Sequence, residues 1–566
     1  MPKLRHSNLA LGLAATGGIA MGATAAPVSA WPLAWVALAP LWIAVRSSGE
    51  VRGGEVRFGP RSPLKALSSA GRYGFAWGFL YGGIVMHWLW YLHPLTWMGV
   101  PWLASVAIAA FCWAAAAVTG GLWIGAWAAL FSFFSQVADR QMGHQRGAIA
   151  RRLVLGTGLW GGLDWAMQQG ILYWPSLALT QSPVNLAALH LSRLSGPATL
   201  SMAIVAVNGL VAEAWLQARA LNTDLQDVSQ RASKPQQSAT AAPQLSRPAR
   251  PSALIAAALG LLIALHGAGL LLLWLPSDGG IPLTVGIVQG NVPTRIKLYS
   301  EGVRRALQGY SQGYSALVDQ GADLVVLPEG ALPFRWDTDG AVSDRNPLAQ
   351  AIQGRGITAL VGTFALRDGK LTQSLLAVEG DGTIAGRYDK IKLVPLGEYI
   401  PLQNTLGKLV GRLSPNQSDM LPGQRDQRFT TSFGTAIAGI CYESAFPAFF
   451  RLQAAAGGTL LVTASNNDPY PPAMMAQHHA QDLMRAIETD RWAVRATNTG
   501  YSGIIDSHGR TRWRSEANVY SLKLATVEQR STQTLYVRWG DWLTPLLVWA
   551  SGLWLLIGWV QRRFGG

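Results

Sequence analysis

Three reactive side chains follow short apolar runs at widely separated points of this sequence. Glu329 follows Leu-Val-Val-Leu-Pro, Lys390 follows the run that begins at Thr383, and Cys441 follows Thr-Ala-Ile-Ala-Gly-Ile. A thiol can act as a nucleophile, a carboxylate can move its proton to a leaving group, and an ammonium group can stabilise a developing oxyanion. The three residue types together therefore indicate acyl transfer.

Cys441 is expected at the junction between a strand, residues 435–441, and a helix, residues 445–456. Backbone N–H groups and the positive end of that helix are expected to lower the pKa of the thiol below its free value of about 8.5. The competing interpretation is a buried, unreactive cysteine. Glu329 and Lys390 likewise have ordinary interpretations, as parts of a solvated turn and a surface loop. The chemical hypothesis depends on the three occurring together.

The composition is that of a membrane protein. Of the 566 residues, 49% are hydrophobic and 14% charged, whereas soluble domains carry about 25% charged residues. The net charge of +15 could indicate nucleic acid. The basic residues lie mostly in short loops between apolar runs, however, so we expect a lipid bilayer as partner and no nucleic acid. Cys112 and Cys441 form no disulfide framework, and no metal-ligand spacing is present, so we expect neither metal nor cofactor.

The apolar runs predict a polytopic helical membrane bundle with about eight spans. Residues 1–217 hold the first six expected spans, at 1–26, 31–45, 73–95, 99–137, 153–172 and 196–216. The remaining chain is expected to form a disordered cytoplasmic linker (218–252), a seventh span (253–275), an extracytoplasmic domain (282–538) and an eighth span (541–560). This arrangement places every arginine-rich short loop on one side of the membrane.

Three features of these spans have competing interpretations. Residues 1–26 could be a cleaved signal peptide, but the apolar run that follows at once favours a retained helix. Residues 99–137 would form a helix of about 58 Å, too long for one crossing, so we expect one crossing plus an interfacial or cavity-facing segment. Asp164, in the fifth span, is either a buried polar site or a side chain that faces water near the end of the span.

The extracytoplasmic stretch alternates strand and helix patterns, which is typical of an α/β enzyme with its site at strand ends. Strands are predicted at 283–289, 323–327, 359–364, 374–379, 383–388, 435–441, 459–464, 493–497 and 503–505. Helices are predicted at 301–320, 445–456 and 473–490.

The motifs around the three reactive residues resemble those of the nitrilase, or carbon–nitrogen hydrolase, superfamily. They read Leu-Pro-Glu329-Gly, Tyr-Asp-Lys390-Ile-Lys-Leu-Val-Pro-Leu-Gly-Glu398 and Gly-Ile-Cys441-Tyr442-Glu443. The resemblance implies an αββα sandwich with a Glu-Lys-Cys triad. Such a domain between a seventh and an eighth span resembles the bacterial apolipoprotein N-acyltransferase family, and this resemblance covers essentially the whole chain. Gln477-His478, residues 485–488 and residues 498–500 also match the pattern.

The resemblance implies a role for each site residue. Cys441 would take an acyl chain from a phospholipid as a thioester, and the amine of a diacylglyceryl-cysteine on a lipoprotein would receive it. Glu329 would be general base and acid, and Lys390 the oxyanion partner. Glu398 would orient Lys390, Glu443 would support the triad, and Tyr442 flanks the nucleophile. The competing Lys392 shares a face with Lys390 on an extended segment, but the eight-residue step to Glu398 in the motif favours Lys390.

The resemblance further implies a multi-pass protein of the bacterial inner (plasma) membrane with a periplasmic catalytic domain, and we expect a monomer. The chain departs from the family pattern at Leu298, at Gln373 and at residues 467–470, which puts substrate preference in doubt. Two other functions remain open from the sequence. One is a membrane-anchored amidase or nitrilase that acts on a small substrate, and the other is a transporter or scaffold that carries an inactive domain.

Overall fold

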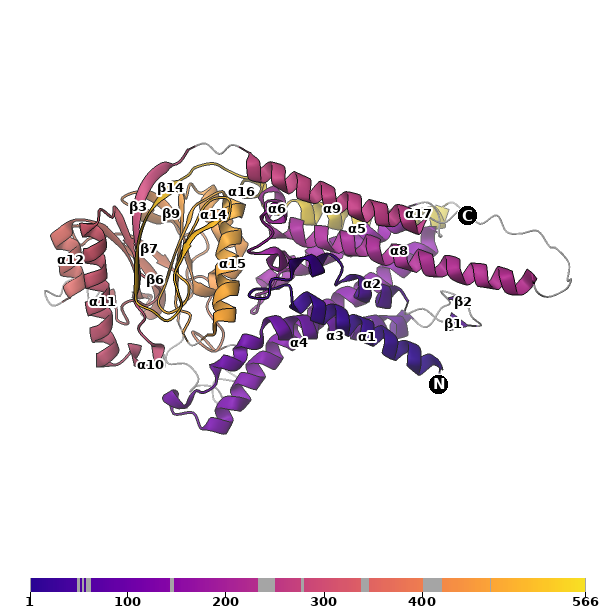
Figure 1. The fold of residues 1–566 in the computed structure, drawn as a ribbon, viewed down its shortest axis with the longest axis horizontal. Helices are drawn as coiled ribbons and strands as arrows, with labels where there is room; N and C mark the ends of the chain where they lie inside the picture. The colour runs from indigo at the N-terminus through magenta and orange to yellow at the C-terminus, as the bar shows by residue number, and fades with distance from the viewer. Residues whose placement is uncertain are drawn as a thin grey trace.

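The computed structural model describes residues 2–47, 51–52, 55–56, 63–142, 147–232, 250–275, 279–336, 346–400, 420–468 and 470–564. Long helices form one end of the molecule and two β-sheets form the other, and both chain termini lie at the helical end (Figure 1). The predicted fold class, a helical membrane bundle with a nitrilase-like α/β domain, is confirmed at this level.

Within the described residues, the helical part holds eight helices of eight or more residues, joined by short helical turns. The longer ones are α1 (Pro2–Gly22), α2 (Ala39–Arg46), α3 (Pro63–Val85), α4 (Trp102–Met142), α5 (Ala148–Gln169), α8 (Pro197–Ala232), α9 (Pro251–Trp274) and α17 (Leu543–Phe564). The turns are η1 (Trp31–Trp35), η2 (His87–Leu92), η3 (Thr96–Met98), η4 (Leu177–Gln181), α6 (Leu186–Leu189) and α7 (Ser192–Ser195), and a small hairpin joins β1 (Val51–Arg52) to β2 (Glu55–Val56).

Four of these helices are long and apolar enough to cross a bilayer: α4, α8, α9 and α17. The predicted span at 31–45 is a 3-10 turn followed by the eight-residue α2, so the count of eight spans is not confirmed. The stretch predicted as a crossing plus a second segment is one uninterrupted helix of 41 residues, α4. The predicted linker starts too early, because α8 continues to Ala232; the rest of it, residues 233–249, lies outside the described residues.

Close backbone contacts and buried charges hold the helices together. A Cβ at Gly78 of α3 would lie 2.5 Å from the carbonyl oxygen of Gly120 in α4, so only glycine permits this approach. Arg152 of α5 donates to Asp139 of α4 and to Glu213 of α8, both at 3.0 Å. Polar pairs of this kind, satisfied inside an apolar bundle, fix the positions of neighbouring helices.

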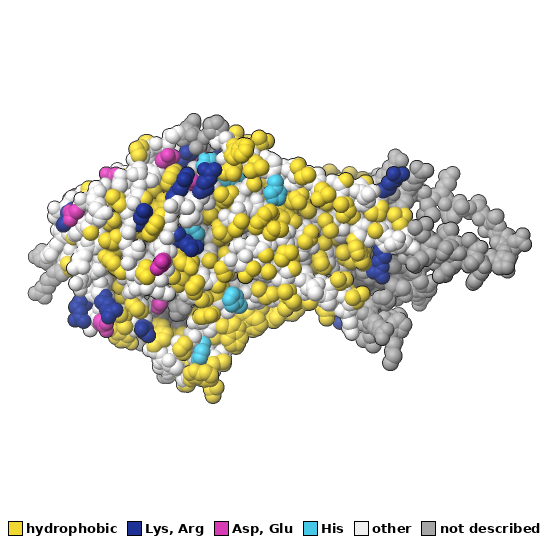
Figure 2. Space-filling view, viewed as in Figure 1, with side chains coloured by type: hydrophobic (Ala, Val, Ile, Leu, Met, Phe, Trp, Pro, Cys, Tyr) yellow, Lys and Arg dark blue, Asp and Glu magenta, His cyan; other side chains and the backbone are white. Residues whose placement is uncertain are grey.

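The surface of the helical part supports its membrane placement. Figure 2 shows side chains over the middle of the molecule that are almost all apolar, whereas Lys, Arg, Asp and Glu gather over the sheets and a few Lys and Arg lie toward the opposite end. Large apolar side chains stay exposed along α9 and α17, including Ile263, Leu271 and Trp549. A contiguous apolar face of this size is stable in contact with lipid.

Two six-stranded sheets form the other end. In the first, the strand order is β14 (Ser521–Gln529), β3 (Ile281–Gln289), β4 (Leu324–Val326), β5 (Thr358–Arg367), β6 (Lys370–Val378), β7 (Ile384–Asp389). In the second it is β13 (Thr511–Arg514), β12 (Gly503–Ile505), β11 (Ala493–Thr497), β10 (Leu460–Ser465), β9 (Gly434–Ile440), β8 (Phe429–Thr431). All nine predicted strands are present, and the three that the sequence missed, β8, β13 and β14, are edge strands.

The two sheets face each other across an apolar layer and are covered by helices on their outer faces. Inward-facing residues of both sheets, among them Ile287, Val326, Ala438 and Val462, form one buried cluster. On the outer face of the first sheet lie α11 (Ser300–Asp319) and α12 (Pro347–Arg355), with the short α10 (Thr294–Lys297) nearby. On the outer face of the second sheet lie α14 (Pro447–Ala455) and α15 (Pro472–Thr489), between the sheet and the membrane helices (Figure 1). This is the predicted αββα sandwich.

A buried glutamine joins the sandwich to the membrane helices. The side-chain oxygen of Gln477, on α15, accepts from the indole N–H groups of Trp88 (3.3 Å) and Trp174 (2.8 Å). Its nitrogen donates to the backbone oxygens of Ala26 and Val85, both at 3.1 Å. All four partners belong to the helical half. Ala26 follows α1, which packs along α3 and α2.

Candidate active site

The direction of the strands places each predicted reactive residue at the carboxyl end of a strand. β3, β4 and β5 run parallel, and the two antiparallel steps from β5 to β6 and from β6 to β7 return β7 to the same direction. Glu329 follows β4 and Lys390 follows β7, so both lie at the carboxyl edge of the first sheet. Cys441 follows β9, which is parallel to β10 in the second sheet.

A buried lysine bridges two carboxylates at this edge. Lys390 Nζ lies 2.9 Å from Glu329 Oε1 and 2.6 Å from Glu398 Oε1, and the lysine side chain is 1% exposed. The other oxygen of Glu398 accepts from the backbone N–H of Val394 at 2.8 Å. Burial alone lowers the pKa of Lys390, but the charges of Glu329 and Glu398 reverse that effect and raise it well above its usual value. The ammonium group therefore stays charged, and Glu398 accepts one of its hydrogen bonds.

Asn466, which follows β10, connects Glu329 to the thiol. Its backbone N–H donates to Glu329 Oε2 at 2.9 Å, and its backbone oxygen lies 4.0 Å from Cys441 Sγ. Cys441 has φ of +52°, a left-handed conformation that is rare for a side chain of this kind and that marks functional positions. The turn of the chain after β9 therefore holds the sulfur beside the carboxylate and lysine cluster.

The predicted low pKa of Cys441 is wrong. Burial raises the pKa of this thiol, the negative charge of Glu329 raises it further, and the charge of Lys390 offsets only part of the rise. No long helix begins directly at the sulfur, because the 3-10 turn η6 (Cys441–Ala445) separates β9 from α14. The resting thiol is therefore protonated, and a nearby base must take its proton for the sulfur to attack.

Glu443 connects the loop of Cys441 to the loop of Lys390. Its Oε2 accepts from the backbone N–H of Ile440 (2.7 Å) and from the hydroxyl of Tyr388 (3.1 Å). Its Oε1 accepts from the backbone N–H groups of Ile391 (2.6 Å) and Lys392 (3.2 Å). Glu443 is fully buried, and burial raises its pKa to about 7 although these bonds favour the charged form. Glu443 thus fixes the relative position of the two loops.

Tyr442 turns away from the triad toward the membrane helices. Its hydroxyl accepts from the backbone N–H of Tyr173 at 2.9 Å and donates to the backbone oxygen of Ile171 at 3.4 Å. Its ring stacks on Trp174, with the planes 10° apart. The three partners belong to the loop after α5. Sequence reasoning missed this loop as part of the site, because nothing local in residues 171–174 indicates a partner that lies some 270 positions away.

The competing lysine, Lys392, does not reach the site cluster. Its Nζ donates to the backbone oxygen of Gly170 at 2.5 Å and lies 4.8 Å from the centre of the Phe446 ring. Lys392 therefore contacts the end of α5, and Lys390 alone of the two lies between the carboxylates. This geometry agrees with the choice of Lys390 that the motif favoured.

We expect Lys390→Arg to lose acyl transfer although the positive charge is kept. A single nitrogen, Lys390 Nζ, lies 2.9 Å from Glu329 and 2.6 Å from Glu398. The larger, planar guanidinium group of arginine cannot fit between these two carboxylates without displacing one of them. The measurement is the rate of acyl-enzyme formation, with Lys392→Met as the matched lysine control. We expect the control to form the adduct. An active Lys390→Arg together with an inactive Lys392→Met would contradict the assignment.

A buried hydrogen-bonded chain supports the backbone of the nucleophile. His478, on α15, lies with Nε2 at 2.8 Å from the carbonyl oxygen of Cys441 and with Nδ1 at 3.0 Å from the side-chain nitrogen of Asn467. Arg495 donates to Asn467 Oδ1 at 3.1 Å and pairs with Asp482. Since the carbonyl only accepts and the Asn467 nitrogen only donates, the imidazole is neutral with its proton on Nε2.

This histidine predicts a loss of stability in acid. Burial lowers the pKa of His478 from 6.5 to about 3. As the pH falls from 6.5 to 5, the unfolded chain takes up a proton that the folded site refuses, which lowers the free energy of unfolding by about 2 kcal/mol. The thermal midpoint of the wild type should therefore fall more between pH 7 and pH 5 than that of His478→Gln, whose amide can make both bonds without titrating. Equal falls would contradict the neutral assignment.

A second buried lysine, which the sequence analysis did not single out, lies behind Glu329. Lys297, the last residue of α10, donates to the backbone oxygen of Glu329 at 3.1 Å. Burial lowers its pKa to about 8, although the charges of Glu329 and Asp468 oppose this. The contact fixes the backbone that carries the carboxylate. A lysine beside an exposed leucine gives no local signal of such a role.

The positions that depart from the family pattern differ in burial and in contacts. Leu298 is exposed on the surface after α10. Gln373, on β6, is buried, and its backbone oxygen accepts from the N–H of Lys390 at 2.8 Å. Asn467 belongs to the hydrogen-bonded chain of His478, and Tyr470 packs edge-on against Trp88 at 5.2 Å. Pro469 lies outside the described residues.

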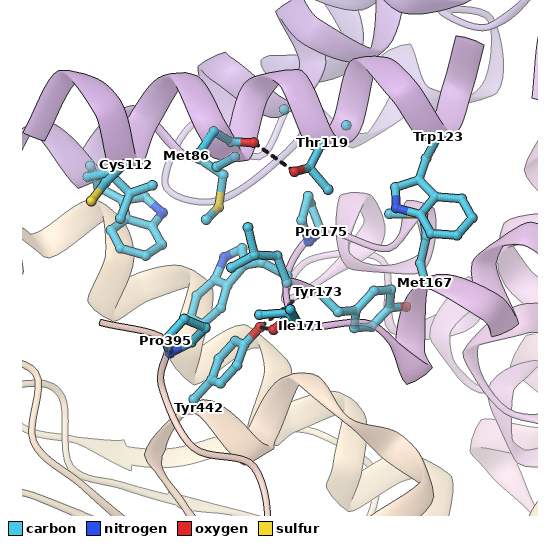
Figure 3. A pocket seen from close by; sticks show the side chains of 18 of the residues that line it. Met86, Cys112, Thr119, Trp123, Met167, Ile171, Tyr173, Pro175, Pro395 and Tyr442 are labelled. Carbon is cyan, nitrogen blue, oxygen red and sulfur yellow. Dashed lines mark hydrogen bonds between the residues drawn. The ribbon is translucent and has the colours of Figure 1, made fainter. Parts of the chain in front are cut away.

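An apolar cavity of about 460 Å³ opens at Cys441 and extends between the membrane helices. The sandwich contributes residues 394–397, Cys441, Tyr442, Tyr470 and Met474 to its wall, and α3, α4, α5, residues 86–95 around η2 and the loop 171–177 contribute the rest. In Figure 3, Cys112, Thr119 and Trp123 lie along one side of α4, and Pro395, Tyr442 and Ile171 lie across from them. A wall of this kind suits a long hydrocarbon chain.

Asp164 is buried, and it lines this cavity, which favours the interpretation as a buried polar site. Its carboxylate accepts from the hydroxyl of Tyr173 at 3.3 Å and from Gln168 at 3.2 Å. Within the described residues, no group of three or more His, Cys, Asp or Glu side chains could hold a metal ion.

Comparison with known proteins gives consistent matches along the chain. A family model described as the apolipoprotein N-acyltransferase N-terminal domain matches residues 17–210, and one described as carbon-nitrogen hydrolase matches residues 284–531. The apolipoprotein N-acyltransferase of Nostoc sp. is 46% identical over 550 residues, which cover 96% of this chain and 98% of that protein. The apolipoprotein N-acyltransferase of Synechocystis sp. is 40% identical, and the match covers 94% of this chain and 98% of that protein. The protein of the same name from Thermosynechococcus vestitus is 38% identical, and the match covers 92% of this chain and 90% of that protein.

These matches do not favour the alternatives of a small-substrate hydrolase or an inactive scaffold, because the relatives that match over the whole length are named as acyltransferases. The sandwich, the helical half and their order along the chain all agree with that name. This chain belongs to the apolipoprotein N-acyltransferase family.

Proposed function

We propose that this protein moves an acyl chain from a phospholipid to the N-terminal amine of a diacylglyceryl-cysteine on a lipoprotein, by way of a thioester on Cys441. One observation carries the proposal. Cys441 lies where the Glu329–Lys390–Glu398 cluster meets an apolar cavity walled by membrane helices. The cluster supplies acyl-transfer chemistry, and the cavity supplies a place for a lipid chain.

In the first half-reaction, Glu329 takes the proton of the Cys441 thiol as the sulfur attacks the ester carbon of the phospholipid. A carbon–sulfur bond forms, and the carbonyl oxygen becomes negative beside the ammonium group of Lys390. The ester carbon–oxygen bond then breaks, and Glu329 gives its proton to the departing oxygen of the lysophospholipid. Because burial raises the pKa of the thiol, this proton transfer must accompany the attack.

In the second half-reaction, the neutral α-amine of the lipoprotein attacks the thioester carbon. Glu329 takes a proton from the attacking nitrogen, and Lys390 again stabilises the negative oxygen. The carbon–sulfur bond breaks, and Glu329 returns the proton to the sulfur of Cys441. The product is an amide, and the cysteine and the carboxylate regain their starting states, so the same three groups serve both steps.

We place the sandwich on the outer side of the inner membrane, with a single copy of the chain as the working unit. The β1–β2 hairpin between α2 and α3 and both ends of the described chain lie away from the sheets (Figure 1), and the sequence around the hairpin is basic, which favours the cytoplasm. Both substrates are anchored in lipid, and extracting one would lose about 0.8 kcal/mol per buried CH₂. The membrane helices that precede and follow the sandwich along the chain, α9 and α17, hold the site at the membrane surface. Neither substrate then has to leave the bilayer.

The test is to incubate the purified protein with a phospholipid and a diacylated lipopeptide. Phospholipid alone should give an acyl-enzyme on Cys441, detected by mass spectrometry, and the lipopeptide should then convert it to a triacylated product. An adduct that forms and is lost to water, with no triacylated lipopeptide, would point to a hydrolase instead. No adduct with any phospholipid would contradict the proposal itself.

A further inference from the structure

The cavity follows one face of α4 over a long distance. Ten of its wall residues belong to α4, in alternating steps of three residues and one: Ile108, Phe111, Cys112, Ala115, Ala116, Thr119, Gly120, Trp123, Ile124 and Trp127. This spacing keeps them on one side of a helix. From the first to the last of these residues the helix rises about 28 Å. The cavity is therefore a slot that runs along the helix axis.

The nucleophile opens into this slot part of the way along it. Tyr442, next to Cys441, contacts Ile171 and Tyr173 just beyond the end of α5. At the far end the wall includes Trp160 of α5 and Trp127 of α4. The nine residues from Trp160 to the end of α5 at Gln169 span about 14 Å. This distance matches one leaflet, which is half of the roughly 30 Å hydrocarbon core.

Interlocked aromatic rings close the far end of the slot. The indole N–H of Trp127 donates to the backbone oxygen of Gly156 at 3.0 Å, and the ring stacks on Phe131 at 5.2 Å. Trp160 meets Trp127 edge-on at 5.4 Å and meets Trp77 edge-on at 6.3 Å. Trp127 is 1% exposed and Trp160 is 6% exposed. Rings held from α3, α4 and α5 in this way cannot move aside easily.

Two polar residues in the wall of the slot, Thr119 and Asp164, are engaged by hydrogen bonds within the protein. The hydroxyl of Thr119 donates to the backbone oxygen of Ala115 in its own helix at 2.7 Å, as the dashed line in Figure 3 shows. The carboxylate of Asp164 accepts from Tyr173 and Gln168. A hydrocarbon chain in the slot therefore meets mostly carbon, and the aromatic floor rather than a polar group limits its length.

We propose that Trp127 and Trp160 form a floor that sets the longest acyl chain that the Cys441 thioester accepts. The inference rests on the proposed function, because the chain in the slot is the one that Cys441 carries. A rigid hydrophobic pocket discriminates a single extra methylene by about tenfold or more. A donor one or two methylenes too long would press on the floor and lift its carbonyl away from Lys390, so acylation would slow steeply beyond a set length.

The experiment measures acyl-enzyme formation with phosphatidylethanolamines and phosphatidylglycerols that carry myristoyl, palmitoyl, stearoyl or arachidoyl chains. In Trp127→Ala, the rate with the longest donor relative to the shortest should rise about tenfold or more over the wild type. The matched control is Trp113→Ala. Trp113 is also on α4 and also donates its indole N–H to a glycine oxygen, Gly83 at 2.8 Å, but it does not line the slot. Its length profile should equal that of the wild type.

A second variant keeps the test decisive if Trp127→Ala does not fold. Thr119→Phe fills the slot above the floor, and its lost hydroxyl bonds only its own helix. Its profile should shift toward the myristoyl donor. If the wild type forms no adduct with any donor, the proposed function fails first. If it does form adducts and both variants keep the wild-type profile, the floor proposal is overturned.

Discussion

Alanine in place of Cys441 will abolish acyl transfer, with a loss on the order of 10⁴-fold or more. Cys441 Sγ is the one nucleophile that the described residues place beside the Glu329–Lys390 pair, and no other thiol lies on the sandwich. The measurement combines mass spectrometry of the phospholipid-treated protein with the yield of triacylated lipopeptide. Both signals should vanish, while the protein still elutes as a folded species in detergent.

The matched control is the other cysteine of the chain. Cys112 is unpaired and lies on α4, within the apolar wall of the cavity. Cys112→Ala should still form the acyl-enzyme, because no carboxylate or lysine among the described residues is found to act on its sulfur. A thioester that persists in Cys441→Ala, or that disappears in Cys112→Ala, would show that the nucleophile has been assigned to the wrong sulfur.

Glu329→Gln should slow the formation of the acyl-enzyme by about 10² to 10⁴-fold, the usual contribution of a general base. The amide has the size of the carboxylate, and its oxygen can still accept from Lys390 or from the backbone N–H of Asn466. It cannot take the thiol proton, and the raised pKa of Cys441 makes that proton transfer obligatory. The measurement is a time course of acyl-enzyme formation with phospholipid alone, in which samples are quenched at intervals. Because no acceptor is present, it reports only the first half-reaction.

Glu301→Gln is the comparison for this second change. Glu301 is an exposed residue at the start of α11, paired with Arg305 at 2.8 Å on the solvent side. The same substitution there should leave the time course unchanged. If Glu329→Gln forms the adduct at the wild-type rate, the proton must leave through another group, and the role given to Glu329 is wrong.

The sandwich and its cluster could be predicted because their signals are local. A branched apolar run ends at Glu329, and another ends before Cys441, so strand direction places each residue at the carboxyl end of a strand in its own sheet. The missed strands β8, β13 and β14 are edge strands, whose partly exposed sequences carry a weaker apolar signal. The pKa of Cys441 could not be predicted, because it depends on burial and on charges that arrive from other strands.

The membrane half was less predictable. An apolar run such as residues 31–45 satisfies a hydropathy argument, yet prolines at 32 and 40 divide it into a 3-10 turn and the short α2. The contacts of Tyr442 with the loop after α5 depend on how the two halves meet, which no local pattern encodes. The contact of Lys392 with the backbone oxygen of Gly170 could not be predicted either, because Gly170 is distant in the sequence and approaches Lys392 only in the folded structure.

The hydrogen bonds of Gln477 have a consequence for movement. A single side chain is tied at once to Trp88, Trp174, Ala26 and Val85, all buried, so any swing of the sheets away from the bilayer would strand several polar atoms in an apolar setting. We therefore expect the two halves to move as one body. If the sandwich does not swing away from the bilayer, a lipid substrate has to reach Cys441 from the side, between helices and within the plane of the membrane.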